Sequence, residues 1–235
     1  MFHKLLRKTL PLVIAAALTI HSFPVSAAVD NTPVSQITAT ESTEDTSTSS
    51  ATATTITVNT SLKATAFKKM STTNFIQALG PIAQADSKES GVLASVTMAQ
   101  AILESGWGKS TLAQKANNLF GMKTSLSGNT WKGSTWDQTS KYKKKTAEYG
   151  RSNRKYYITA AFRKYTSVSQ SIGDHSAYLT GAKNGSSYRY KGLTSTTSYK
   201  KQLTIIRKGG YATSNTYVKD LCKIIKKYKL YEWDI

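Results

Sequence analysis

Cysteine and histidine are scarce in this chain of 235 residues. Its one cysteine, Cys222, excludes an intramolecular disulfide and leaves no cysteine cluster for a metal. Of the three histidines, His3 and His21 lie close to the N-terminus and only His175 lies further along. The sequence therefore offers no histidine-based zinc site, and we expect neither a metal ion nor another cofactor. Cys222 itself is predicted to be a small apolar residue on the flank of a helix.

Long apolar runs are also lacking, since crossing a bilayer takes about 20 residues. The run Leu10–Ile20 is shorter, follows three Lys and Arg residues, and precedes small residues that end at Ala27. This pattern is typical of a cleaved secretory signal, which we assign to residues 1–27. No membrane-spanning segment is expected after cleavage. Export without a disulfide fits a bacterial envelope better than an animal secretory route.

Aromatic and basic residues are absent from Asn31–Thr60, which is rich in Thr and Ser. A segment of this composition cannot bury enough apolar surface to offset the conformational entropy lost on ordering. We therefore predict a disordered linker at residues 28–64, acting as a spacer across a cell wall or simply as solvated chain. One folded domain is predicted to occupy residues 65–235.

Acidic residues are few where basic residues are many. Residues 66–235 hold 28 of the 32 Lys and Arg but 9 of the 13 Asp and Glu, so the whole formal charge of +19 lies there. Such a domain attracts polyanions, which for an exported bacterial protein are teichoic acids and other anionic wall polymers. Nucleic acid is not expected as a partner, because the lysines are spread along the domain and no nucleic-acid-binding signature occurs. The densest basic run, Lys141–Lys145, is predicted to be a solvated loop and strand face.

Hydrophobic periodicity predicts an α+β domain in which helices come first, a β-hairpin follows, and helices return. The hairpin is predicted from Lys144–Tyr149 and Lys155–Phe162, two strand-like runs on either side of Gly150–Asn153. Pro81 should kink the first helix or mark a join within it. Tyr188–Thr204 is predicted to form a short helix and a loop over the cleft. The predicted helices are Asn74–Glu89, a helix from Ala94 that carries Glu104, Ser110–Lys115, Ser167–Leu179 and Thr216–Tyr228.

One carboxylate has unusual surroundings, in the stretch Ala99–Gly108 (AQAILESGWG). Apolar residues at helical spacing up to Leu103 predict a helix with one face in the core, and Gly106 is positioned to end it. Glu104 would then lie at the negative end of the helix dipole, beside an apolar run and Trp107. Both surroundings disfavour the ionised carboxylate and raise its pKa, which suits a general acid. The alternative is an ordinary exposed glutamate in a last helical turn.

Four motifs of this chain occur together, and in the same order, in one known family. The stretch AQAILESGWGKS is followed by NNLFGMK, FRKYTSVSQSIGDHSAYL and GGYAT. These motifs resemble the glucosaminidase family of bacterial peptidoglycan hydrolases, and the resemblance extends over roughly residues 70–230. It implies a lysozyme-like, two-lobed fold, mostly helical, with the hairpin as a small β lobe. It also implies that Glu104 is the essential acid and that residues 65–235 form a catalytic domain.

A second carboxylate is also implied by the resemblance. Hydrolysis of a glycosidic bond needs a proton on the leaving oxygen and help for an oxocarbenium-like transition state. Glu148, on the first predicted strand, matches the family's second glutamate, which is carried on the β lobe. It would act as a nucleophile at about 5 Å from the acid and as a base at a wider separation. Its role would be smaller if the substrate's own 2-acetamido oxygen attacks the anomeric carbon. The alternative to a catalytic role is that Glu148 pairs across the hairpin with Lys155 or Arg154.

The remaining site residues are implied by the other motifs. Tyr211 matches the tyrosine of the family's GYAT motif, where a phenol could orient the acetamido group or a water molecule. The alternative is a buried tyrosine behind a glycine turn. Many relatives continue with Asp-Pro, whereas this chain has Ser214-Asn215, which affects only the start of the next helix. The residues expected to line the sugar cleft are Trp107, Asn118, Phe120 and Gly121, whereas Tyr178 is expected in the core and Asp174-His175 as a structural hydrogen-bonding pair.

The predicted function is that of a secreted, monomeric peptidoglycan hydrolase associated with the bacterial cell wall. The resemblance favours an autolysin that cleaves the glycan strand as an endo-β-N-acetylglucosaminidase and binds anionic wall polymer through its basic surface. A muramidase or lytic transglycosylase on the same fold would use one glutamate in a similar way. From another class, a non-catalytic polycation could bind wall polymer or nucleic acid.

Overall fold

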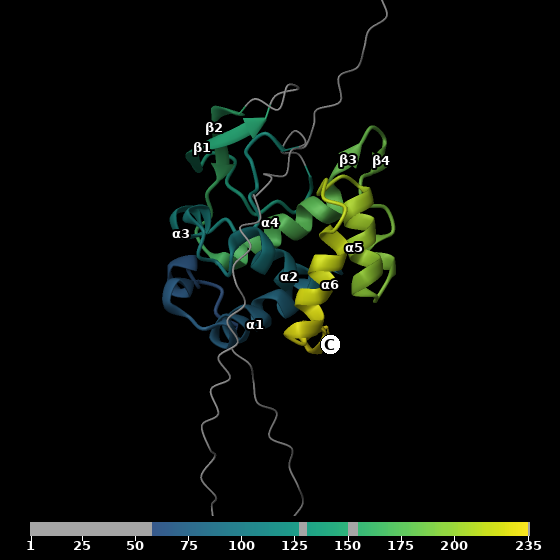
Figure 1. Ribbon diagram of the computed structural model, residues 1–235. Helices are drawn as coiled ribbons and strands as arrows, with labels where there is room; N and C mark the ends of the chain where they lie inside the picture. Colours follow the sequence, from purple (N-terminus) through teal and green to yellow (C-terminus); the bar gives the residue numbers. More distant parts are fainter. Residues whose placement is uncertain (1–57, 127–130, 150–154, 235) are drawn as a thin grey trace, which may run out of the picture. The chain divides into compact units, whose positions relative to one another are not determined.

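The computed structural model describes residues 58–126, 131–149 and 155–234 (Figure 1). The predicted signal at residues 1–27 and residues 28–57 of the predicted linker lie outside the described residues. Within residues 58–64, Leu62 is half-buried against the hydrophobic core. The boundary between linker and domain stays a prediction. In the part of the chain that the structure describes, no helix is both long and apolar enough to cross a membrane.

The helices lie close to where the sequence predicts them, with bounds that differ by at most two residues. Short 3-10 helices occur at Ala64–Lys69, Leu193–Ser195 and Leu230–Trp233. The α-helices are α1 Thr72–Ser90, α2 Ala94–Ser105, α3 Thr111–Ala116, α4 Val168–Gly181, α5 Tyr199–Lys208 and α6 Tyr217–Lys227. The predicted short helix within Tyr188–Thr204 corresponds to one 3-10 turn and the beginning of α5.

Hydroxyl side chains and a glycine set several helix ends. At the start of α3, the Ser110 hydroxyl accepts a hydrogen bond from the backbone N–H of Ala113. Ser167 caps α4 in the same way by accepting from the N–H of Gln170. Gly91 ends α1 in the left-handed region with a φ of 74°, which costs glycine little. These local signals explain why the helix ends could be placed from sequence.

Helix α1 contradicts the prediction of a join at Pro81, because it continues through that residue. Proline lacks the N–H that would bond to the carbonyl of Gln77, four residues earlier. Gln77 is exposed, so water can solvate the carbonyl that loses its partner. The proline therefore removes one hydrogen bond without ending the helix.

Helix α2 is buried on all sides, whereas the sequence predicted burial of one face. Ten of its twelve residues are buried, and Leu103 and Glu104 are the exceptions. Helices α1, α5 and α6 and the 3-10 helix Leu230–Trp233 all contact it. Small residues such as Ala94 and Ser95 let these neighbours approach from directions that the apolar stripe does not cover. Helix α2 thus lies at the centre of the helical part of the domain (Figure 1).

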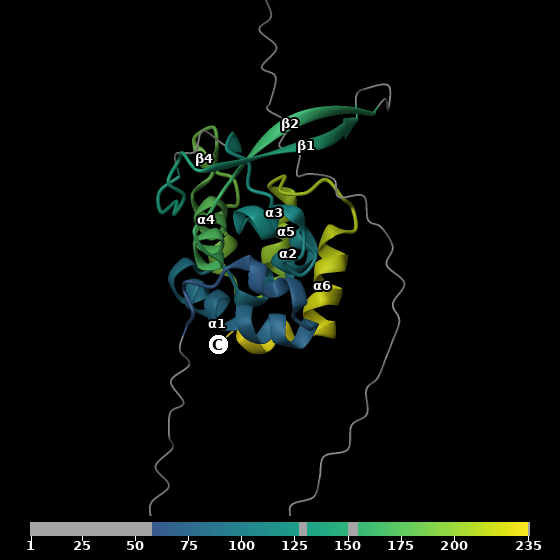
Figure 2. The same cartoon turned by 90° about the vertical axis from the view of Figure 1, so that its left-hand side faces the viewer.

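The predicted β-hairpin is present, with strands β1 Lys141–Tyr149 and β2 Lys155–Arg163 (Figure 2). The strands pair antiparallel from Lys141 opposite Arg163 to Tyr149 opposite Lys155. Strand β1 begins three residues before the predicted start, so the run Lys141–Lys145 lies entirely in a strand. A small apolar cluster seats the hairpin on α3, and its buried members are Leu112, Ala116, Ala160 and Phe162.

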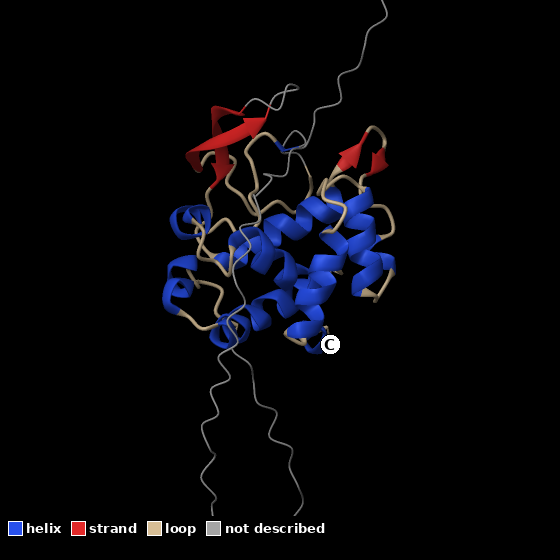
Figure 3. Ribbon diagram, viewed as in Figure 1, coloured by secondary structure: helices blue, strands red, loops and turns tan. Residues whose placement is uncertain are grey.

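A second, two-residue hairpin was not predicted. Strands β3 Lys183–Asn184 and β4 Ser187–Tyr188 pair directly after α4 (Figure 3). Periodicity cannot reveal strands as short as these, because two residues show no alternation. With this addition, the described chain is a mostly helical α+β domain with a small antiparallel hairpin, and the predicted fold class is confirmed.

The end of β2 is fixed to α4 by a buried ion pair. The Arg163 guanidinium lies 2.8 Å from a carboxylate oxygen of Asp174, and both side chains are fully buried. The hydroxyl of Tyr165 donates to the same carboxylate at 2.6 Å. The rings of Trp131 and Trp136 lie 4.2 and 4.6 Å from the guanidinium carbon, so the cation is enclosed by π faces. A buried charge needs such partners, and here they tie the hairpin to the helical core.

Candidate active site

Glu104 lies in the last turn of α2, directly before the helix ends at Ser105 and Gly106. Gly106 adopts a φ of 56°, and a Cβ built on it would meet no atom within 4 Å. Burial of the Glu104 carboxyl raises its pKa to about 7, in the direction that the sequence predicts, while a hydrogen bond from Tyr217 opposes the rise. A carboxyl with this pKa is partly protonated at neutral pH and can donate a proton.

Tyr217, the first residue of α6, holds the Glu104 carboxylate. Its hydroxyl donates to Glu104 Oε1 at 3.4 Å and accepts from Gln100 Nε2 at 2.9 Å. Gln100 lies one turn before Glu104 on α2, and both Gln100 and Tyr217 are buried. Because Gln100 donates to the phenol oxygen, the phenol proton is directed toward the carboxylate. The three side chains therefore form a hydrogen-bonded chain from the protein interior to the acid.

Sequence reasoning missed Tyr217. It predicted the helix Thr216–Tyr228 but gave no role to the tyrosine near its start. The ring is buried as an ordinary core aromatic would be, so neither periodicity nor composition marks it. A weak signal was the presence of a second tyrosine six residues after Tyr211, in a segment that the resemblance already placed near the acid.

Tyr211, His175 and Phe120 form an aromatic group beside this chain. His175 Nε2 lies 3.1 Å from the Tyr211 hydroxyl, and the Phe120 and His175 rings are stacked at 3.8 Å. Complete burial lowers the pKa of His175 to about 3, so its ring is neutral at ordinary pH. The Tyr211 ring lies 6.2 Å from that of Tyr217, and the pKa of Tyr211 is raised by burial, with smaller contributions from Tyr217 and Glu104. Tyr211 is thus close enough to Glu104 for the two groups to interact electrostatically, and its role in the site stays a prediction.

Asp174 and His175 are neighbours in sequence but do not act as a pair. Asp174 binds Arg163 and Tyr165, whereas His175 contacts Tyr211 and Phe120. The predicted structural role suits both residues, but each fulfils it with partners from other elements. Successive helix positions point in different directions, which explains the separation.

Asn118 and Gly121 belong to the loop that presents Phe120. The Asn118 amide donates to the carbonyls of Met122 and Arg163 at 2.9 and 2.8 Å and accepts from the Met122 N–H at 3.0 Å. Its polar atoms are therefore engaged with backbone, which closes the loop and ties it to the end of β2. Gly121 has a φ of 69°, and a Cβ built on it would meet no atom within 4 Å.

Two of the predicted site residues are not joined to this group by the geometry. The Trp107 ring packs edge-on against Phe75 and Tyr228, at 5.4 and 4.9 Å between ring centroids. Those contacts hold the half-buried ring against the core, between α1 and the end of α6. Glu148 lies on β1 opposite Tyr156, but its side chain is outside the described residues. Tyr178, which the sequence placed in the core, is buried.

The described residues also include side chains of the types that could bind a metal ion. Across 58–126, 131–149 and 155–234, no group of three or more His, Cys, Asp or Glu side chains is arranged to hold a metal ion. The chemistry that this arrangement can perform is proton transfer from Glu104, with tyrosine hydroxyls and a neutral histidine beside it.

A carboxyl with a raised pKa at the end of a central helix, in a mostly helical domain with a small hairpin, is the arrangement of a lysozyme-like glucosaminidase domain. The chain belongs to the glucosaminidase family: residues 80–230 match the family model described as mannosyl-glycoprotein endo-beta-N-acetylglucosaminidase. The fold and family that the sequence motifs implied are therefore confirmed.

Curated relatives and solved structures agree with this assignment. The exo-glucosaminidase LytG of Bacillus subtilis is 38% identical over 160 residues, which cover 68% of this chain and 52% of LytG. The autolysin of Enterococcus faecalis is 36% identical over 168 residues, covering 70% of this chain and 21% of the autolysin. The crystal structure of the catalytic domain of the autolysin Auto from Listeria monocytogenes is similar with a TM-score of 0.59 and 33% identity, covering 70% of this chain and 89% of that domain. The chain thus spans about half or less of the length of these two curated relatives.

Proposed function

We propose that this protein is a secreted peptidoglycan hydrolase that cleaves the glycan strand as an endo-β-N-acetylglucosaminidase. The observation that carries the proposal is the Glu104 carboxyl, whose pKa is raised to about 7 by burial at the end of α2. In a glucosaminidase-family domain, the atom that accepts this proton would be the oxygen that links two amino sugars. Residues 1–27 supply the export signal in this proposal, and the role is autolytic, in wall turnover, cell separation or lysis.

In the proposed mechanism, protonated Glu104 donates its proton to the glycosidic oxygen as the bond to the anomeric carbon breaks. Positive charge develops on the sugar ring, and the new carboxylate remains hydrogen-bonded to Tyr217. The Tyr211 hydroxyl, oriented by His175, is placed to hold the substrate's acetamido group or a water molecule. Phe120 and Gly121 line the sugar cleft, and Asn118 acts on the substrate only by holding their loop.

Glu148 is proposed as the second carboxylate. Its strand, β1, belongs to the hairpin that is seated on α3. It would act as nucleophile or base according to its distance from Glu104, unless the acetamido oxygen of the substrate attacks first. A retained anomeric configuration in the products of wild-type enzyme would exclude a direct attack by water.

The identity of the cleaved bond is tested by mass spectrometry of borohydride-reduced products from purified peptidoglycan, with wild type and Glu104→Gln in parallel. Reduced N-acetylglucosamine ends made only by wild type would support the proposal. Reduced N-acetylmuramic ends indicate a muramidase, and anhydro ends a lytic transglycosylase. Internal cleavage releases long fragments, whereas an exo enzyme, as the name of LytG describes that relative, releases short ones from chain ends.

The protein is further proposed to act as a monomer bound to the wall through its basic surface. The formal charge of +19 supports attraction to anionic wall polymers such as teichoic acids. A purely binding, non-catalytic role is the rival from another class. It requires that Glu104→Gln cells behave like wild type in autolysis, and it fails if autolysis is lost while wall binding is kept.

A further inference from the structure

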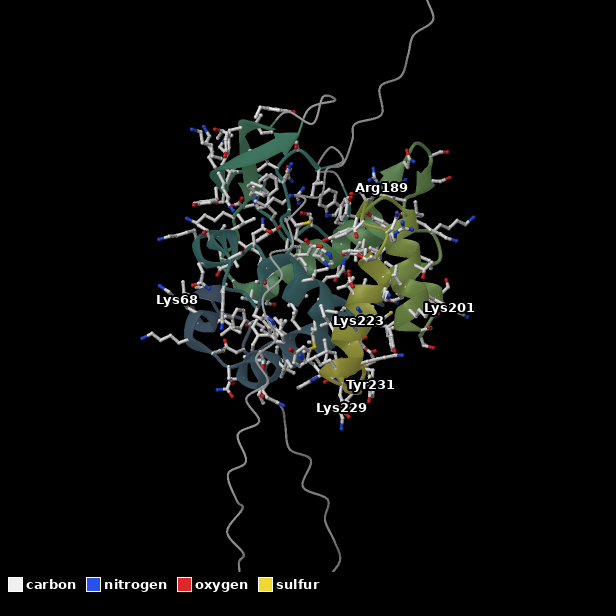
Figure 4. The ribbon with its side chains drawn as sticks, viewed as in Figure 1. Lys68, Arg189, Lys201, Lys223, Lys229 and Tyr231 are labelled. Carbon is white, nitrogen blue, oxygen red and sulfur yellow. The ribbon has the colours of Figure 1, made fainter. Side chains whose placement is uncertain are left out.

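The outer faces of α5 and α6 carry a dense group of lysines that the proposed catalysis does not use. We name this group the lysine face, and all of its side chains are exposed. Figure 4 shows Lys201 and Lys223 projecting from these two helices. The members of the lysine face are Lys200, Lys201, Lys219, Lys223, Lys226 and Lys227.

The two helices bring their lysines together instead of separating them. Helices α5 and α6 pack against each other. Burial raises the pKa of the Cys222 thiol on α6, and the charges of Lys200 from α5 and Lys226 from α6 oppose that rise. Both ammonium groups are thus close enough to act on one thiol. Positive charge from two elements converges on one surface.

Acidic residues do little to neutralise this surface. Asp220 lies 4.0 Å from the Lys223 ammonium, and the Lys223 side chain is 68% exposed, so water screens their attraction. Most protein surfaces mix both signs, because like charges held close together repel and destabilise the fold. Helix α6 needs only its inner residues, such as Leu221 and Ile225, for packing. The lysines on its outer side are therefore not required by the fold.

We propose that the lysine face is the docking surface for a linear polyanion of phosphodiester units attached to the bacterial wall. The assignment of the wall as its location rests on the proposed function. Lys219, Lys223 and Lys227 follow one another at i, i+4 and i+8, which places them about 6 Å apart along the axis of α6. A polymer with one charge per repeat can follow such a row. Lysine suits a flexible polymer, because its ammonium is a point charge that demands no fixed geometry.

The lysine face lacks features that favour nucleic acid. Single-stranded nucleic acid binds through bases stacked on exposed aromatic rings, in addition to its phosphates. On the two helices, Tyr217 is buried and Tyr199 is half-buried, so neither helix carries an exposed ring. Beyond α6, the half-buried Tyr228 ring lies 5.2 Å from the Lys227 ammonium, and the exposed Tyr231 belongs to the following 3-10 helix. Arg207, the arginine of α5, bonds to the Ser214 carbonyl and the Asn215 side chain. A polyol phosphate offers charge without bases and matches this surface better.

The test compares two variants that lose the same charge from different places. The docking variant combines Lys219→Gln, Lys223→Gln, Lys226→Gln and Lys227→Gln. The control variant combines Lys68→Gln, Lys69→Gln, Lys88→Gln and Lys115→Gln, four exposed lysines that lie outside α5 and α6. Figure 4 shows Lys68 on the opposite side of the view from Lys201. Thermal unfolding of both variants verifies that they are folded.

Binding is measured by co-sedimentation with purified walls, before and after hydrofluoric acid removes their phosphodiester polymers, across about 50 to 200 mM salt. We expect wild type to bind untreated walls more tightly than stripped walls, with affinity falling steeply as salt rises. The docking variant should bind untreated walls at least about tenfold more weakly, and the control should lose much less. Equal losses in both variants, or wild-type binding that survives stripping, would overturn the proposal. Tighter binding to duplex DNA than to purified polymer at the same salt would also overturn it.

Cleavage of soluble, polymer-free glycan fragments separates this proposal from the proposed function. The docking variant should cleave them at the wild-type rate, because its changes lie outside the residues around Glu104. If wild type cleaves no glycan, the proposed function fails, whereas the sedimentation result still decides where the polymer docks. If the docking variant loses cleavage of soluble fragments, the lysine face belongs to the catalytic cleft and the docking proposal is wrong.

Discussion

The Tyr217 hydroxyl lies 3.4 Å from Glu104 Oε1 and 2.9 Å from Gln100 Nε2. The phenol at the start of α6 thus bonds to two side chains of α2, one turn apart. This arrangement fixes the rotamer of the acid before substrate arrives. A proton donor held in place loses less entropy in the transition state than one that must first be immobilised.

Replacement of Glu104 by Gln should remove most of the glycosidase activity. Glutamine has nearly the same shape but carries no ionisable proton, and general acid catalysis contributes about 100 to 10,000-fold to rates. We expect kcat to fall within that range while binding of glycan fragments persists. Steady-state kinetics on soluble fragments measures the first quantity, and calorimetric titration measures the second. Full activity of the variant would assign the proton to another group.

The same variant should be more stable than wild type at alkaline pH. Burial raises the pKa of Glu104 from 4.5 to about 7, so the folded state binds a proton more tightly than the unfolded state. The associated stability is present below pH 4.5 and is lost as pH rises through 7. Glu104→Gln abolishes this loss, and its gain over wild type should reach on the order of 1 to 3 kcal/mol at high pH. Urea unfolding at acidic and alkaline pH measures the gain. If the difference in unfolding free energy between variant and wild type is the same at both pH values, the protonation of Glu104 is not coupled to folding.

Tyr217→Phe should shift the pH dependence of activity. The hydrogen bond from Tyr217 lowers the pKa of Glu104, so its loss raises that pKa above about 7. The alkaline limb of the kcat profile should therefore move to higher pH, while kcat at its optimum falls because the carboxyl is less well held. An unchanged alkaline limb would show that the phenol has a packing role alone. Tyr228→Phe, which changes a half-buried tyrosine packed against Trp107, is the matched control.

His175→Phe should weaken activity and reduce acid sensitivity together. The neutral ring in wild type has a pKa of about 3, against 6.5 in the unfolded chain, so stability is lost as pH falls from 6.5 toward 3. Phenylalanine keeps the stack on Phe120, carries no proton and leaves the Tyr211 hydroxyl without its partner. The variant should be less stable than wild type at neutral pH, because the Tyr211 hydroxyl has lost its partner. As pH falls, wild type loses stability through His175 and the variant does not, so the difference in unfolding free energy should become smaller. Activity that equals wild type would exclude a positioning role for His175 on Tyr211.

Arg163→Met should destabilise the domain by about 3 to 5 kcal/mol, because it leaves the buried Asp174 carboxylate unpaired. Removal of both charges in Arg163→Met with Asp174→Leu should cost less than the sum of the two single changes. Denaturant unfolding of the three variants measures the free energies. Additive losses would show that the two side chains contribute independently.

Much of this domain could be predicted from local signals. Caps such as Ser110, the left-handed Gly91, and the strand runs around residue 150 each act within a few residues, so helices and hairpin were found with small errors. The all-round burial of α2 could not be predicted, because it depends on which helices arrive from distant parts of the chain. The continuation of α1 through Pro81 has a related reason, since solvent access to the Gln77 carbonyl helps a helix to tolerate a proline, and the predicted kink stays a prediction.

In the candidate active site, too, local features could be predicted from the sequence and long-range contacts could not. The surroundings of Glu104 in sequence were sufficient to predict the direction of its pKa shift, because apolar neighbours and a helix end lie within the motif. Its partner Tyr217 lies 113 residues away, and no periodicity connects the two. Trp107 stands three residues from Glu104, but its ring packs against Phe75 and Tyr228. The predicted role of Trp107 in the cleft therefore stays a prediction, whereas the distance in sequence concealed Tyr217.

Asn118 has a consequence for how the domain can move. Its amide joins the loop that carries Phe120 to the Arg163 carbonyl at the end of β2, and the Arg163 N–H bonds to the Met122 carbonyl. The hairpin and the loop are therefore one mechanical unit, anchored through Arg163 to α4. Any tilt of the hairpin is therefore transmitted to Phe120, so we expect the strand that carries Glu148 and the loop that carries Phe120 to move together.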